Sequence, residues 1–170
     1  TRMGYEKFGF LAAKDYWFDN NFRRRFFKNL INLIPISRKP NPESLDLDDT
    51  MTLSKAFMDL GNNIIIFPEG SRGEVGKIQR FRKGAVKFSM GLDVPILPAA
   101  IMGAEKAWPK GEKFIKPFPI TVKVLPKIDP PKTKELSKTA YNKALSKITK
   151  DLEIKISEAV KELKETKSPD

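Results

Sequence analysis

The sequence predicts an α/β domain with a mixed, mostly parallel central sheet flanked by helices, and a long amphipathic helix at the carboxyl-terminal end. Short continuous apolar runs, typical of strands buried on both faces, occur at residues 8–13, 63–67 and 94–101. Segments with helical spacing of apolar residues separate these runs, and strands that alternate with helices are typical of α/β domains. The length of 170 residues suits a single hydrophobic core.

The remaining elements follow from periodicity and from the residues that begin and end helices. An amphipathic helix is expected from about Asp19 to Ile34, and a short apolar run at 35–37 leads to Arg38. A second helix is expected at 50–60, and its inward residues would be Met51, Ala56, Phe57 and Leu60. The other expected elements are a helix at 84–90, a half-exposed strand at 119–125, and a helix at 133–164 that Asp151 could interrupt.

Two further expectations concern boundaries. Residues 1–130 should form the α/β domain, and residues 131–170 should form a helical extension that packs on it. The first strand begins so soon after Thr1 that we expect further residues upstream.

Pro98 lies within the apolar run at 94–101 and argues against a regular ladder there, because proline has no N–H to donate.

The composition is strongly basic. Thirty-two Lys and Arg residues against 21 Asp and Glu give a net charge of +11, which attracts nucleic acid, an anionic membrane surface or a phosphorylated small molecule. A lysine-rich solubilising surface explains the same excess equally well. The sequence has no Cys and no His, so a zinc site is not expected, because carboxylates alone suit harder cations. No residue is assigned to a metal site. No apolar run is long enough to predict a membrane-spanning segment.

The stretch IIIFPEGSRG, residues 64–73, carries the densest chemistry of the chain. A buried strand ends there in Pro68, Glu69, Gly70, Ser71 and Arg72, and ligands of α/β domains bind at the carboxyl ends of strands. An arginine fork matches phosphate oxygens, and glycine lets backbone N–H groups approach an anion closely. The alternative is a simple turn with a surface pair between Glu69 and Arg72, worth less than ~1 kcal/mol.

The segment FPEGSRG closely resembles the third conserved block of the glycerolipid acyltransferases, the family of the lysophosphatidic acid acyltransferases. Residues 34–38 (IPISR) are similar to the second block, and residues 94–99 (VPILPA) are similar to the fourth. The spacing of these blocks also agrees, as does the segment FRKG at 81–84. The resemblance extends from residue 8 to about residue 130.

This resemblance implies transfer of a fatty acyl group from acyl-CoA or acyl carrier protein to the hydroxyl of a lysophospholipid. The implied acceptor is 1-acylglycerol 3-phosphate, and the implied role is in phospholipid biosynthesis at the cytoplasmic face of a membrane, with no separate cofactor. The implied site has two arginines that hold the acceptor phosphate, a turn that shapes the acceptor pocket, and two prolines on the acyl side. In that order these are Arg38 and Arg72; Glu69, Gly70 and Ser71; and Pro95 and Pro98.

The chain departs from the family pattern in one respect. The family's first block has the pattern His-x-x-x-x-Asp, and its histidine serves as the general base, whereas this sequence contains no histidine. Lys14 and Asp15 are not substitutes, because neither supplies an imidazole. We therefore expect the catalytic His and Asp upstream of residue 1 and no catalytic residue within the chain. The alternative is a non-catalytic module that keeps the phosphate site.

Partners can be narrowed further. The expected helix at 22–34 carries Arg23, Arg24, Arg25 and Lys28, which either dock on an anionic leaflet or remain solvated while the helix packs on the sheet. A peripheral membrane contact, a lysophospholipid and an acyl donor are the expected partners. Specific nucleic-acid binding is not expected, because the aromatic residues fall mostly at core spacing and no recognition motif is present.

Overall fold

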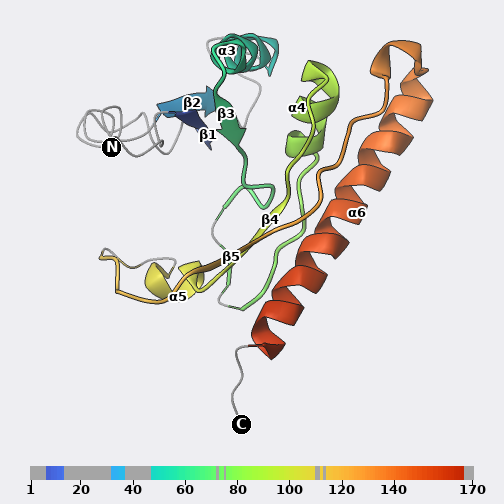
Figure 1. Cartoon of the computed structure of the whole chain (residues 1–170). Coiled ribbons are helices and arrows are strands. Elements are labelled where there is room, and N and C mark those ends of the chain that lie inside the picture. The colour runs from blue at the N-terminus through green and yellow to red at the C-terminus, as the bar shows by residue number, and fades with distance from the viewer. Residues whose placement is uncertain are drawn as a thin grey trace. The chain divides into compact units, whose positions relative to one another are not determined.

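The computed structural model describes residues 7–13, 32–36, 47–71, 73–74, 76–109, 112 and 114–166. The chain divides into two compact units, Thr1–Phe67 and Pro68–Asp170, and each unit is described by itself (Figure 1).

The first unit contains a parallel sheet of three strands in the order β2-β1-β3. The register places Leu11 opposite Ile34 and Gly9 opposite Ile64. Because the strands are parallel, their carboxyl ends lie at the same edge of the sheet. The strands are β1 (Phe8–Ala13), β2 (Asn32–Ile36) and β3 (Asn63–Ile65).

The end of the predicted helix at 19–34 is wrong, because Asn32–Ile36 forms strand β2. Leu33 and Ile34 satisfy a helical period, but they also belong to an apolar run that pairs with Phe10 and Leu11 of β1. Backbone pairing with β1 overrides the local period here. The rest of that predicted helix lies outside the described residues.

Helix α3 (Leu47–Asp59) packs against β2 and β3. Gly9 of the central strand β1 lets the Phe57 ring of α3 approach the sheet, since a Cβ at that position would lie 2.7 Å from this ring. Among residues 49–59 of α3, the buried positions are Thr50 and Ser54, both with no exposed surface. The predicted inward positions Ala56 and Leu60 are wrong, since Ala56 is exposed and Leu60 is 79% exposed.

The second unit combines a two-stranded antiparallel sheet with three helices among the described residues. In the sheet, Ile101 of β4 lies opposite Val122 of β5. Pro98 directly precedes β4, and Ile96 forms only an isolated bridge with Ile128, so the predicted strand at 94–101 is interrupted at the proline. The elements are α4 (Gly84–Leu92), β4 (Ala99–Met102), α5 (Ala104–Ala107), β5 (Thr121–Val124), a 3₁₀ turn (Thr133–Glu135) and α6 (Lys138–Glu165).

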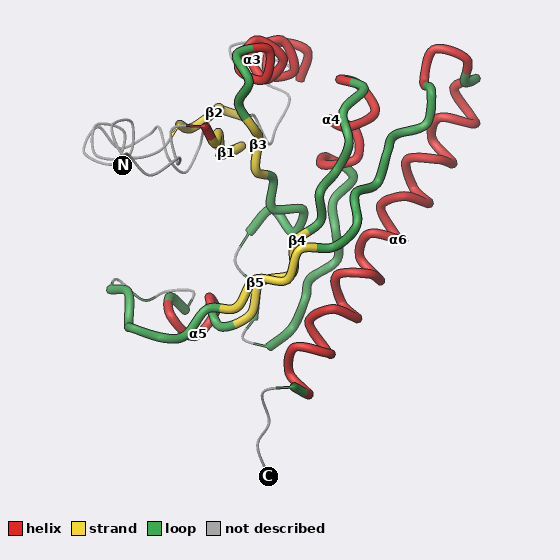
Figure 2. Tube along the Cα trace, viewed as in Figure 1, coloured by secondary structure: helices red, strands yellow, loops and turns green. Residues whose placement is uncertain are grey.

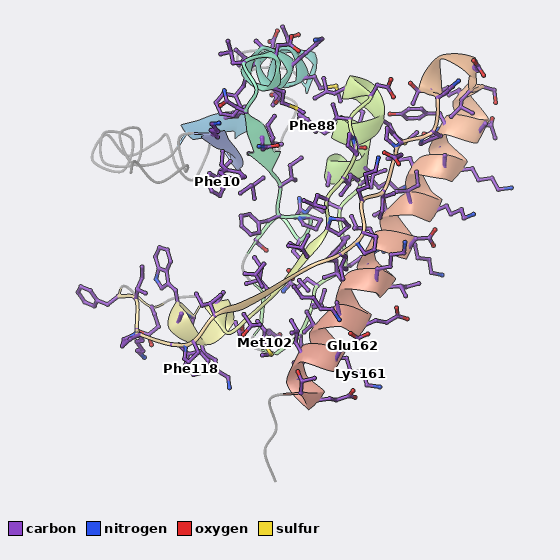
Figure 3. All side chains as sticks on the ribbon, in the orientation of Figure 1. Phe10, Phe88, Met102, Phe118, Lys161 and Glu162 are labelled. Carbon is purple, nitrogen blue, oxygen red and sulfur yellow. The ribbon has the colours of Figure 1, made fainter. Side chains whose placement is uncertain are left out.

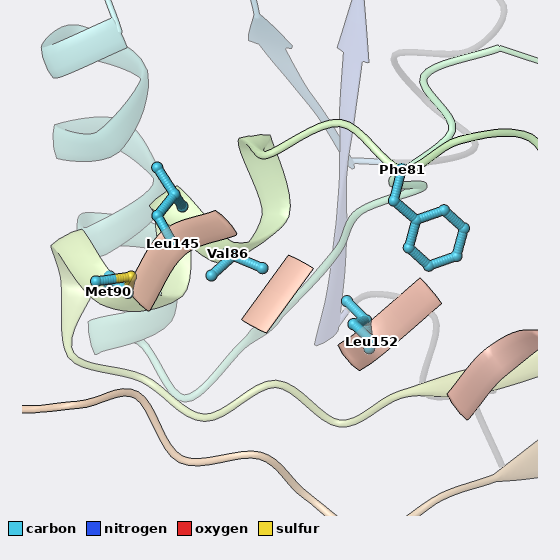
Figure 4. Packing of buried hydrophobic residues seen from close by; sticks show 5 residues of the cluster. All are labelled: Phe81, Val86, Met90, Leu145 and Leu152. Atoms are coloured by element: carbon cyan, nitrogen blue, oxygen red, sulfur yellow. The ribbon is translucent and has the colours of Figure 1, made fainter. Parts of the chain in front are cut away.

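Helix α6 packs against α4 and β4 and forms one continuous helix in Figure 2. Asp151 is exposed and does not interrupt it. Ser137 begins the helix by accepting a hydrogen bond from the Ala140 N–H at 3.2 Å. The apolar side chains that join α4, α6 and the preceding loop form the core of this unit, shown in Figure 4: Phe81, Val86, Met90, Leu145 and Leu152.

The α/β fold class with a long carboxyl-terminal helix is confirmed, and the strands of the predicted mixed, mostly parallel sheet form two small sheets. The parallel pairs belong to the first unit and the antiparallel pair to the second. In the described part of the chain, none of the helices has both the length and the apolar character needed to cross a bilayer.

Candidate functional site

The candidate site is built on the turn Pro68–Gly70, which opens the second unit. Two hydrogen bonds hold this turn against the segment 79–82. The Arg82 N–H donates to the Pro68 carbonyl at 2.8 Å, and the Gln79 N–H donates to Oε2 of Glu69 at 2.8 Å. Glu69 is half-buried, and its carboxylate stabilises the turn by accepting this hydrogen bond.

Glycine is required where the turn meets the side chain of Arg82. Gly70 has a φ of +72°, a conformation that side-chain-bearing residues rarely adopt. A Cβ on Gly70 would lie 3.0 Å from Nε of Arg82 and 3.4 Å from its Cζ. The guanidinium of Arg82 therefore lies directly against the backbone of the turn.

The Arg82 side chain is exposed and carries a full positive charge. Among the described residues, no carboxylate forms an ion pair with it. The five N–H donors of its guanidinium thus lack a charged partner within this part of the chain. An exposed guanidinium without a carboxylate partner, held against a glycine turn, is suited to bind an anion.

The segment that carries Arg82 is anchored to α6. The Phe81 N–H donates to Oε2 of Glu153 at 2.6 Å, and Nζ of Lys83 donates to the Ser146 hydroxyl at 2.8 Å. Phe81 itself is buried in the core of the unit. Helix α4 begins directly afterwards, at Gly84, without a side-chain cap on its first N–H groups. The positive end of the α4 dipole therefore adds to the charge of Arg82.

The structure brings together some of the predicted site residues. Glu69 and Gly70 lie in the turn, and Ser71 follows them as an exposed residue. Pro95 is exposed, whereas Pro98 is buried, and its carbonyl accepts a hydrogen bond from the Leu125 N–H at 2.9 Å. Arg38 and Arg72 lie outside the described residues, so their predicted role in phosphate binding stays a prediction.

Gln79 and Arg82 are the residues of this arrangement to which the sequence pattern gave no role. Both lie in a loop without hydrophobic periodicity, and the tertiary fold brings both into contact with the turn. The segment FRKG at 81–84 was part of the family resemblance, and its two basic residues before a helix are the signal that could have indicated Arg82. In the described ranges, no three acidic residues gather as a cation site.

A family model described as "Acyltransferase" matches residues 3–102, which is more than half of the chain. This chain belongs to the acyltransferase family. The relatives of this acyltransferase-family chain are consistent with that assignment. A 1-acyl-sn-glycerol-3-phosphate acyltransferase of Limnanthes douglasii is 42% identical over 67 residues, covering 39% of this chain and 24% of the relative. The enzyme of the same name from Borreliella burgdorferi is 31% identical over 101 residues, covering 59% of this chain and 39% of the relative.

The fold of this acyltransferase-family chain also matches a solved structure. The crystal structure of PlsC, a 1-acyl-sn-glycerophosphate acyltransferase from Thermotoga maritima, superposes with a TM-score of 0.55 at 20% identity. The match covers 89% of this chain and 57% of the solved chain. The acyltransferase-family chain thus spans well under two thirds of the length of these relatives.

Proposed function

We propose that this chain is the acceptor-binding part of an enzyme that transfers a fatty acyl group to the hydroxyl of 1-acylglycerol 3-phosphate. The acyl donor is acyl-CoA or acyl carrier protein, no further cofactor takes part, and the product enters phospholipid synthesis at the cytoplasmic face of a membrane. Membership of the acyltransferase family and the names of the relatives support this proposal.

The observation that carries the proposal is the contact between Gly70 and Arg82. The acceptor phosphate bears nearly two negative charges, and a guanidinium answers it with parallel N–H donors. The absence of a side chain at Gly70 lets the Arg82 side chain lie against the turn, and the uncapped start of α4 follows Arg82 closely. Arg38 and Arg72 supply the further charges that a dianion requires.

The other site residues take supporting roles in this proposal. Glu69 positions the turn through its bond to the Gln79 N–H and borders the acceptor pocket with Ser71. Pro95 and Pro98 shape the side of the site that receives the acyl chain. Pro98 suits that role because it is buried directly before β4, where its carbonyl is fixed by Leu125.

In the proposed reaction the acceptor hydroxyl oxygen attacks the thioester carbonyl carbon. A new C–O ester bond forms, the C–S bond breaks, and the hydroxyl proton passes through a base to the departing thiolate. Such a base is normally an imidazole near neutral pH, and the 170 residues contain none. We therefore propose that the base is a histidine outside these residues and that the chain alone is inactive.

A second candidate is a non-catalytic module that binds phosphorylated lipid. The absence of histidine from the chain favours it. It shares the Gly70–Arg82 contact with the enzyme and differs from it only in turnover.

A radiolabelled acyl-transfer assay tests the proposed function. The chain alone, given acyl-CoA and lysophosphatidate, should form no phosphatidate, while the product of the complete gene, with its His-x-x-x-x-Asp block, should form it. The matched control is the complete protein with that histidine changed to alanine. A complete protein that has the block and yields no product would contradict the enzyme. A gene without the block, together with binding of lysophosphatidate by its product, would support the binding module.

A further inference from the structure

The segment between α5 and β5, residues 108–120, exposes large apolar side chains (we name this segment the aromatic loop). Phe114 is 79% exposed, Ile115 is 70% exposed and Phe118 is 42% exposed. Figure 3 shows Phe118 beside α5, at the end of the unit remote from the middle of α6. Side chains of this size are costly to leave in water, so two adjacent ones at such exposure call for a physical explanation.

Hydrogen bonds hold the aromatic loop, although its apolar side chains are exposed. The Lys116 N–H donates to the Ala107 carbonyl at 2.8 Å, which closes the loop at its base. Nε1 of Trp108 donates to the Glu112 carbonyl at 2.9 Å. At Gly103 a Cβ would lie 2.1 Å from the Pro119 carbonyl oxygen, so the start of α5 packs tightly against the end of the loop. Phe114 and Ile115 are thus held outward by a hydrogen-bonded loop.

Lysines are frequent in the sequence of this loop and directly before it. Nζ of Lys106 lies 5.1 Å from the centre of the Phe118 ring. The sequence from 106 to 116 contains four lysines against one glutamate, Glu112, whose carboxylate lies 3.6 Å from Nζ of Lys116. An apolar tip in a lysine-rich loop matches the interface of an anionic bilayer, where rings enter the headgroup layer and lysines meet lipid phosphates.

The same composition argues against a protein partner as the occupant. The buried cores of protein interfaces are depleted in lysine, because an ammonium group is costly to desolvate. At a bilayer the lysine stems extend along the apolar layer while the charged ends remain in water. The lysine content of the loop therefore favours lipid over protein.

We propose that the aromatic loop is a membrane-docking element that inserts Phe114 and Ile115 into the headgroup region of an anionic phospholipid bilayer. The inference rests on the proposed function only for its purpose, since a lysophospholipid acceptor and its product both reside in a bilayer. The contact itself is measurable without any acyl transfer.

Vesicle flotation of the purified chain tests the proposal. The vesicles contain phosphatidylcholine alone or phosphatidylcholine with 30% (about one lipid in three) phosphatidylglycerol, a composition that sets the negative surface charge. The test variant is F114Q/I115Q. The matched control is Ile154→Gln, which removes an apolar side chain that is 45% exposed on α6. Thermal unfolding of every variant accompanies the flotation.

The chain should bind the anionic vesicles and release from them as salt shortens the Debye length below about 10 Å. The double variant should bind at least about tenfold more weakly with its melting temperature unchanged, while Ile154→Gln should bind normally. Three results would each overturn the proposal: no vesicle binding by the unchanged chain, equal binding by the double variant, or a melting temperature lowered several degrees in the double variant, which would show that these side chains pack within the chain.

Failure of this inference can be told apart from failure of the proposed function. Normal acyl transfer by the complete protein without loop-dependent vesicle binding contradicts the docking element alone. Loop-dependent vesicle binding without acyl transfer contradicts the enzyme alone.

Discussion

At the scale of single residues, a comparison of alanine variants at Gly70 and Gly76 distinguishes the effect of backbone strain from the effect of the contact with Arg82. Both have a positive φ, +72° and +78°, but a Cβ on Gly76 would meet nothing within 4 Å, whereas one on Gly70 would meet Arg82. Either change to alanine should lower the free energy of unfolding by about 1–2 kcal/mol, the cost of a left-handed non-glycine residue. Only Gly70→Ala should also weaken binding of lysophosphatidate, because it displaces the Arg82 guanidinium.

Thermal unfolding and lipid titration of both variants make this comparison. Equal lipid affinity in Gly70→Ala and Gly76→Ala would exclude the contact between Gly70 and Arg82 from the acceptor site.

At the scale of elements, Glu153 connects α6 to the segment that carries Arg82. Its carboxylate accepts the Phe81 N–H at 2.6 Å beside a buried ring. Glu153→Ala should leave that N–H unpaired and cost about 1–3 kcal/mol. For a chain of this length each kcal/mol lowers the melting temperature by roughly 2–4 °C.

Glu153→Gln keeps an acceptor oxygen in place and should recover most of the lost stability. Glu158→Ala removes an exposed carboxylate from the same helix and serves as the control. Differential scanning calorimetry measures all three, and a Glu158→Ala variant destabilised as strongly as Glu153→Ala would show that helix charge, rather than the bond to Phe81, is responsible.

At the scale of the whole molecule, the elements that the sequence predicted well are those whose local pattern and tertiary role agree. The run FGFLAA forms β1 over the predicted residues 8–13 as the central strand between β2 and β3, although its first residue, Phe8, is exposed. The long helix was predicted from an apolar stripe whose residues are all buried or half-buried: Tyr141, Leu145, Ile148, Leu152, Ile156, Val160 and Leu163. Pro98 likewise interrupts the predicted strand at 94–101, as its missing N–H led us to expect.

The failures arise where distant contacts decide. Leu33 and Ile34 fit a helical period, yet pairing with β1 makes them part of a strand. Thr50 and Ser54 were not expected inside, but packing of α3 against β2 and β3 buries that face. For the candidate site, the motif itself indicated Glu69 and Gly70. The contact between Gly70 and Arg82 depends on a loop that folds back across the intervening residues 71–81, and the basic residues before α4 give no indication of that contact.

The central claim is that the turn at Gly70 and the side chain of Arg82 bind the phosphate of a lipid acceptor. The most direct test is a calorimetric titration of the chain with short-chain lysophosphatidate and with the monoacylglycerol of the same acyl length, both kept monomeric. The two lipids differ only in the phosphate. Arg82→Ala is the test variant, and Arg80→Ala removes a neighbouring exposed charge as the control.

The chain should bind the phosphorylated lipid at least about tenfold more tightly than the monoacylglycerol, as expected for charge-assisted hydrogen bonds. Arg82→Ala should lose most of that preference and Arg80→Ala should keep it. Equal affinity for the two lipids, or equal losses in the two arginine variants, would contradict phosphate binding at this turn.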